Sequence, residues 1–142
     1  MIRKEWLQIL GEFVVGGICA IIGALIGGSA GFLIYGMYPQ VFAERGGFEG
    51  FIGPISSLIG IALGSFLGVW WFGSRKNKTA CPKVTALFTG VGLLLSLILF
   101  NFSNSYIAPL YTTYSVLYNL SALFGWLLPL SAAVIGFNIS KK

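Results

Sequence analysis

Histidine and aspartate are absent from this chain, and only 9% of its 142 residues are charged. Histidine-based metal sites, histidine-ligated haem and Ser-His-Asp catalysis are therefore excluded, and we predict neither catalytic residues nor a metal centre. The acidic residues are Glu5, Glu12, Glu44 and Glu49. Only Glu12 approaches an apolar segment, and we expect it to snorkel to the headgroup region. An ion-coupled pump is disfavoured, because such pumps carry ionisable residues inside the membrane.

Cysteine is scarce as well. Cys19 falls within the first apolar segment and Cys81 within a polar one, and these different depths predict no disulfide between them. The TACPK segment around Cys81 offers no second cysteine and no histidine for a zinc site.

Apolar residues dominate the chain. They make up 56% of it, with a mean hydropathy of +0.87, whereas a soluble domain is about one quarter charged. Four stretches carry no charge and are long enough to cross a hydrocarbon core of about 30 Å. They cover residues 13–35, 51–72, 84–102 and 117–138. We predict an all-α membrane protein with one domain, residues 1–142, of four transmembrane helices. The first stretch is too long for the core of a signal peptide, so we expect it to remain as a helix.

The cations predict how the chain crosses the membrane. Eight of the nine lie before the first stretch, between the second and third, or after the fourth: Arg3, Lys4, Arg75, Lys76, Lys78, Lys83, Lys141 and Lys142. These segments share one side of a four-span protein, so the positive-inside rule places both termini in the cytoplasm. The net charge of +5 then reflects topology and contact with anionic lipid headgroups, and we expect no nucleic-acid partner. Trp70 and Trp71 are expected to act as interfacial anchors.

Glycine recurs with the same spacing in the first two stretches. GALIGGSAGFLIYG begins at Gly23, and GIALGSFLGVWWFG begins 37 residues later at Gly60. The glycines expected to pack helices are Gly16, Gly23, Gly27 and Gly31 in the first stretch and Gly53, Gly60, Gly64 and Gly68 in the second. Residues four apart share a helix face, so these glycines predict a glycine zipper that presses the two helices together as an antiparallel hairpin. A second small stripe of Ala20, Ala24 and Gly28 would serve another neighbour.

The third and fourth stretches carry milder versions of this pattern. Small or weakly polar residues share one face of each helix: Thr85, Thr89, Gly92 and Ser96 on one, and Ser121, Gly125, Pro129 and Ala133 on the other. Pro129 has no backbone N–H, so the Gly125 carbonyl must find its hydrogen bond on a neighbour. We expect Asn138 and the other late asparagines to satisfy helix ends or to bond across helices.

Three functions remain open. The pattern favours a non-enzymatic subunit that packs into a larger membrane complex with other integral membrane subunits and stabilises it or helps to assemble it. In a photosynthetic or respiratory complex such a subunit would hold lipid, pigment or quinone by apolar contact. The alternative is a small homo-oligomeric channel or facilitator for an uncharged or passively moving solute. An enzyme acting on lipid is the least favoured, since no acid, base and nucleophile come together. We expect a multi-pass location in a bacterial inner membrane or a thylakoid-type membrane.

Overall fold

The computed structural model describes residues 2–37, 49–75, 80–107 and 111–140. Within them the secondary structure is helical and consists of α1 (Ile2–Met37), α3 (Glu49–Ser74), α4 (Pro82–Phe102), the short π-helix η1 (Ser103–Ile107) and α5 (Tyr111–Ile139). Four candidate spans are long and apolar enough to cross a membrane, as in a multi-pass membrane protein. They run over Glu5–Met37, Ile52–Ser74, Pro82–Ser105 and Asn119–Ile139.

Helix α1 is longer than the predicted span. Its 36 residues correspond to roughly 54 Å, against a hydrocarbon core of about 30 Å. The predicted span began at residue 13 because Glu12 is the last charged residue before it. Charged and polar residues can continue a helix beyond the apolar stretch.

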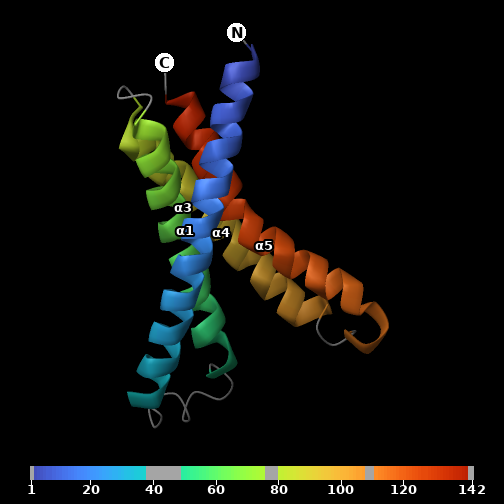
Figure 1. Ribbon diagram of the computed structural model, residues 1–142. Helices are drawn as coiled ribbons and strands as arrows, with labels where there is room; N and C mark the ends of the chain where they lie inside the picture. Colours follow the sequence, from blue (N-terminus) through green and yellow to red (C-terminus); the bar gives the residue numbers. More distant parts are fainter. Residues whose placement is uncertain (1, 38–48, 76–79, 108–110, 141–142) are drawn as a thin grey trace.

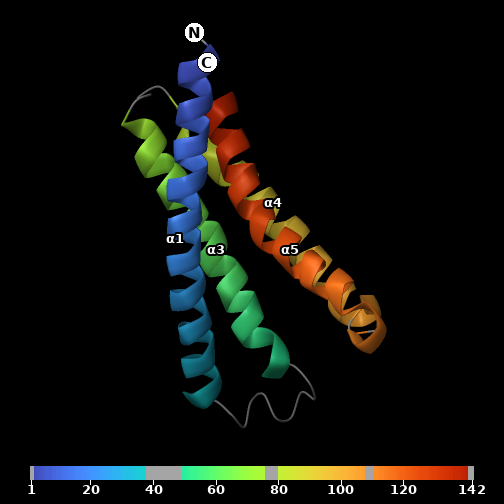
Figure 2. The ribbon, with the colours of Figure 1, turned by 45° about the vertical axis from the view of Figure 1, so that its right-hand side comes forward.

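The helices form two antiparallel hairpins, α1 with α3 and α4 with α5. In Figures 1 and 2 the hairpins converge at the end that carries both chain termini and diverge toward the opposite end. Helix α3 contacts both members of the second hairpin. The bundle is therefore V-shaped, closed at one end and open at the other.

Two apolar clusters hold the hairpins together. One contains Val69 of α3 with Leu130, Val134 and Phe137 of α5, and the half-buried Trp70 packs against it. The second joins Ala20 and Ala24 of α1 to Leu58 and Ile61 of α3, with side chains of α4 packed against it. The second small stripe of α1 thus packs against α3, as the glycines of the first stripe do, and not against a different neighbour as expected.

Candidate binding cleft between the two helical hairpins

Backbone contact between glycines closes the first hairpin. A Cβ placed on Gly23 would overlap the carbonyl oxygen of Gly60, and a Cβ placed on Gly60 would overlap the carbonyl oxygen of Gly23. Here the glycines permit an approach that any side chain would block. Close backbone approach gains dispersion contacts where lipid tails provide no hydrophobic drive.

The contacts on either side of this crossing repeat each other. A Cβ on Gly27 would meet the carbonyl oxygen of Ser56, and a Cβ on Gly64 would meet that of Cys19. Gly64 lies 37 residues after Gly27, as Ser56 does after Cys19. Exchanging α1 with α3 therefore maps one contact onto the other, and the sequence repeat becomes a local two-fold pseudosymmetry. Ser56 and Cys19 were not among the predicted packing residues.

The other glycines of this hairpin occupy more varied surroundings. Gly31 faces the Ser56 side chain, and Gly68 faces the Gly16 backbone and Cys19. Gly16 also accommodates side chains of Val69 and Leu130. Gly53 differs, because a Cβ there would make only ordinary contact, 3.5 Å from the ring of Phe32.

The second hairpin combines one close glycine contact with hydroxyl bonds. A Cβ on Gly92 would lie 2.9 Å from the carbonyl oxygen of Leu128, so Gly92 sets the approach of α4 to α5. The buried Thr89 hydroxyl instead donates to the Thr85 carbonyl oxygen of its own helix at 2.7 Å. A Cβ on Gly125 would have no neighbour within 4 Å, so Gly125 opens onto space where close packing was expected.

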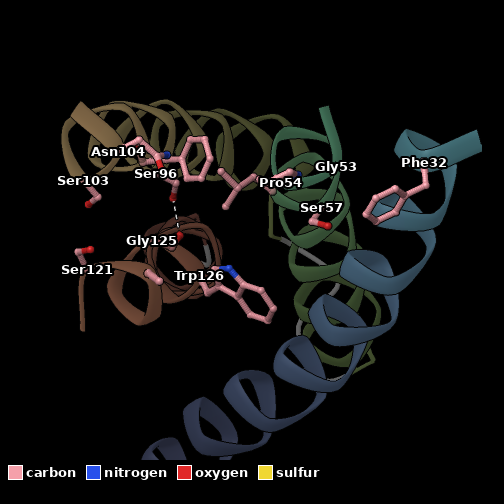
Figure 3. Close-up of a pocket in the computed structure, with 13 residues that line it drawn as sticks. Phe32, Gly53, Pro54, Ser57, Ser96, Ser103, Asn104, Ser121, Gly125 and Trp126 are labelled. Atoms are coloured by element: carbon pink, nitrogen blue, oxygen red, sulfur yellow. Dashed lines mark hydrogen bonds between the residues drawn. The ribbon is translucent and has the colours of Figure 1, made fainter. Parts of the chain in front are cut away.

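The predicted bond to the Gly125 carbonyl is present. The Ser96 hydroxyl lies 2.7 Å from the Gly125 oxygen and 2.9 Å from that of Gly92 in its own helix. Gly125 is the acceptor that needs this proton, since Pro129 occupies the position whose N–H would otherwise bond to it. The prediction is confirmed, and Figure 3 shows the bond crossing from α4 to α5.

Between the diverging hairpins lies a cleft of about 330 Å³. Figure 3 shows Trp126 extending from α5 into the gap and Phe32 approaching from α1 on the opposite side. Leu58 of α3 and Phe100 of α4 complete the apolar walls. Gly125 lies at the wall where its missing side chain leaves room. The cleft is thus an apolar and aromatic cavity shared by all four long helices.

A few small polar groups also line this cleft. Asn104 donates to the Phe100 carbonyl oxygen at 3.0 Å, as expected for an asparagine at a helix end. Ser103 is 5% exposed, and its hydroxyl has no hydrogen-bond partner. Its side chain points from η1 toward Ser121 on α5 (Figure 3). A buried polar group of this kind is costly unless something bonds to it.

The residues predicted for the membrane interface have diverse environments. The Arg75 guanidinium stacks 3.8 Å from the ring centroid of Trp71, which is 54% exposed. Lys83 is exposed on the first turn of α4.

Trp70 packs edge-on against Phe137, with ring centroids 6.1 Å apart, so Trp70 also belongs to the core. The backbones of Arg3 and Lys4 lie in the first turn of α1, while Lys76 and Lys78 fall outside the described residues.

Glu12 does not snorkel, contrary to expectation. It lies within the first candidate span and is 0% exposed. Its carboxylate accepts bonds from the amides of Gln8, at 3.0 Å, and Asn138, at 2.6 Å. Asn138 thus bonds across helices as predicted. The prediction was wrong because the sequence does not reveal that the Asn138 amide of α5 lies beside Glu12.

The chain matches no protein-family model, no curated protein and no solved structure. The functional argument therefore rests on the geometry. Among the described residues, no group of three or more histidine, cysteine or acidic side chains is placed to hold a metal ion. The cleft itself was not predicted, but one sequence signal marks its polar end: Thr89, Ser96 and Ser103 recur every seven residues and continue one face of α4 into η1.

Proposed function

We propose that the chain is a non-enzymatic integral membrane subunit that packs into a larger membrane complex and stabilises or helps to assemble it. The observation that carries this proposal is the divergence of the two hairpins at one end (Figure 2). Each hairpin is closed by contacts of its own, yet a cleft lies between the faces that they turn toward each other there. A partner helix would complete the bundle.

The exposed apolar side chains at this opening support the same role. Phe32 is 73% exposed and Trp126 is 50% exposed, on opposite sides of the cleft. Large apolar side chains facing lipid are ordinary, but here they face each other across a gap. In a bilayer, helices associate by packing and by interhelical hydrogen bonds. A partner that filled this gap would gain contact area from both hairpins at once.

The proposed orientation is cytoplasmic for both termini. The beginning of α1, the end of α3, the beginning of α4 and the end of α5 lie at one end of the bundle. In the sequence, eight of the nine cations fall near these helix ends, and only Arg45 falls between α1 and α3. The positive-inside rule then favours the closed end as cytoplasmic and the opening as the opposite face. A bacterial inner membrane or a thylakoid-type membrane is the proposed location.

The glycine faces of α1 and α3 act, in this proposal, as a glycine zipper that makes the first hairpin a rigid unit. The reciprocal contact of Gly23 with Gly60 supports this. A preformed hairpin loses little conformational freedom when it docks, which favours assembly.

Photo-crosslinking in the native membrane tests the proposal. A photoreactive amino acid replaces Phe32 at the opening, and a matched variant carries it at Leu25, which is exposed on the same helix but does not line the cleft. We expect crosslinks to another polypeptide from position 32 and not from position 25. Native mass spectrometry of the tagged wild type should then show that polypeptide in a fixed ratio. A homo-oligomer alone, without crosslinks to a different protein, would contradict the proposal and favour the channel or facilitator, to be followed by solute flux in liposomes.

A further inference from the structure

The hydroxyl groups along one face of α4 are bonded at every position but the last. Thr85 and Thr89 each donate to the carbonyl oxygen four residues earlier, and Ser96 donates to the carbonyl oxygen of Gly125. Ser103 continues this face, yet its buried hydroxyl has no partner, and it lines the cleft. The Ser65 hydroxyl is also unpartnered, but it lies among packed helices and lines no part of the cleft. Ser103 therefore holds an unused hydrogen-bond donor at the wall of the cleft.

We propose that the cleft binds one acyl chain of a membrane glycerolipid, and that Ser103 donates its proton to the ester carbonyl of that chain. The hydrocarbon would lie against Phe32, Leu58, Phe100 and Trp126. This inference goes beyond the proposed assembly role, because the site lies within a single chain and needs no partner protein.

The position of Ser103 along the helix favours an ester carbonyl. The charge-free stretch predicted as the third span covers residues 84–102, and α4 ends at Phe102, so Ser103 directly follows the expected boundary. Ester carbonyls of glycerolipids lie at this level, between the headgroups and the hydrocarbon. From Ser103 the cleft extends toward Ser96, about 10 Å deeper along α4. A chain anchored at Ser103 would run from the boundary into the bundle.

The lining chemistry agrees with this occupant. None of the 13 lining residues carries a charge, so the cleft suits an uncharged group and leaves a charged headgroup outside. A volume of about 330 Å³ falls in the range of small-ligand pockets, roughly 300–1,000 Å³. An uncharged acyl chain with one hydrogen-bond acceptor fits both the lining and the volume.

A pair of lipid probes tests the hydrogen bond. Purified protein is titrated with a diacyl phosphatidylglycerol and with its diether analogue, which lacks ester carbonyls, and bound lipid is counted by native mass spectrometry. We expect the wild type to bind the diacyl lipid about fivefold more tightly, as one hydrogen bond provides. Ser103→Ala should lose this preference and Ser103→Thr should keep it. Ser105→Ala is the matched control, because Ser105 is exposed and bonds to Asn101.

A second pair of variants tests the cleft. Gly125→Leu places a side chain where a Cβ has no neighbour within 4 Å, and we expect it to reduce diacyl lipid binding at least tenfold. Gly90→Leu is the control, because a Cβ at Gly90 also has no neighbour and Gly90 lies outside the cleft. The melting temperatures of both variants are measured to check that the two are equally stable. Equal diacyl and diether binding by the wild type, or unchanged binding by Gly125→Leu, would overturn the proposal. Binding of an added isoprenoid quinone in place of the diacyl lipid would overturn it as well.

Discussion

The Ser96 hydroxyl lies 2.7 Å from the carbonyl oxygen of Gly125 and supplies the hydrogen bond that Pro129 withholds. This contact joins α4 to α5 at the inner end of the cleft. A buried carbonyl without a donor is expensive in a membrane, because no water replaces the missing bond.

Replacing Ser96 should therefore weaken the second hairpin. We expect Ser96→Ala to lower the free energy of unfolding by about 1–2 kcal/mol. In a Pro129→Ala background the helix provides its own N–H to Gly125, so the same substitution should cost clearly less. The free energy of unfolding is measured in mixed micelles for the wild type, Ser96→Ala, Pro129→Ala and the double variant, and gives the coupling energy between Ser96 and Pro129. Equal losses in both backgrounds would show that Ser96 does not serve the orphaned carbonyl.

Enlarging the glycines of the first hairpin should separate α1 from α3. Gly27→Leu and Gly64→Leu each push a side chain into a backbone carbonyl of the other helix, and we expect each to cost about 3 kcal/mol or more. Gly90→Leu provides the control, since open space surrounds that position. Thermal unfolding and co-purification with partners report the effect. If all three variants matched the wild type, close glycine packing would not stabilise the hairpin.

The hydrogen bond from Asn138 to Glu12 should stabilise the fold. Removing its amide with Asn138→Ala takes away a short bond to a buried carboxylate, and we expect a loss of about 1.5–3 kcal/mol. Gln8→Ala removes the longer bond, of 3.0 Å against 2.6 Å, and should cost less. Glu12→Gln should reduce the penalty of Asn138→Ala, because a neutral amide tolerates the loss better. Chemical unfolding of these variants checks the order, and an unchanged penalty in the Glu12→Gln background would contradict it.

The two adjacent tryptophans should behave differently. Trp70 packs against Phe137 in the core, whereas Trp71 is largely exposed beneath Arg75. Trp70→Ala should cost about 3–5 kcal/mol, and Trp71→Ala should change stability by less than about 1 kcal/mol. Melting temperatures in detergent would reveal the difference. Similar losses from both substitutions would mean that Trp70 acts mainly as an interfacial anchor.

Much of the fold follows from the sequence, since length and hydropathy suffice for four membrane-length helices. The bond to Gly125 could also be predicted, because a proline in a helix leaves a carbonyl at a known position. Glu12 was misjudged for a different reason. Its burial depends on Asn138, which is 126 residues away in the chain, and periodicity within one helix does not reveal such a contact.

The cleft could not be predicted either. It exists because two hairpins diverge, and the angle between them depends on side chains from four helices acting together. The glycine pattern predicted close helix packing at both Gly92 and Gly125. Gly92 does contact α5, whereas Gly125 opens onto the cleft. Residue type determines what can pack closely, whereas the neighbouring helix determines whether it does.

The matching contacts around Gly23 and Gly60 have a consequence for insertion. Around this crossing α1 and α3 meet through equivalent backbone positions, so the central contacts would be the same if the two helices exchanged places. These contacts therefore contain no preference for one membrane face over the other. We expect the flanking charges to set the direction in which the hairpin enters the bilayer, and moving a few lysines across the bilayer should invert it without disturbing these central contacts.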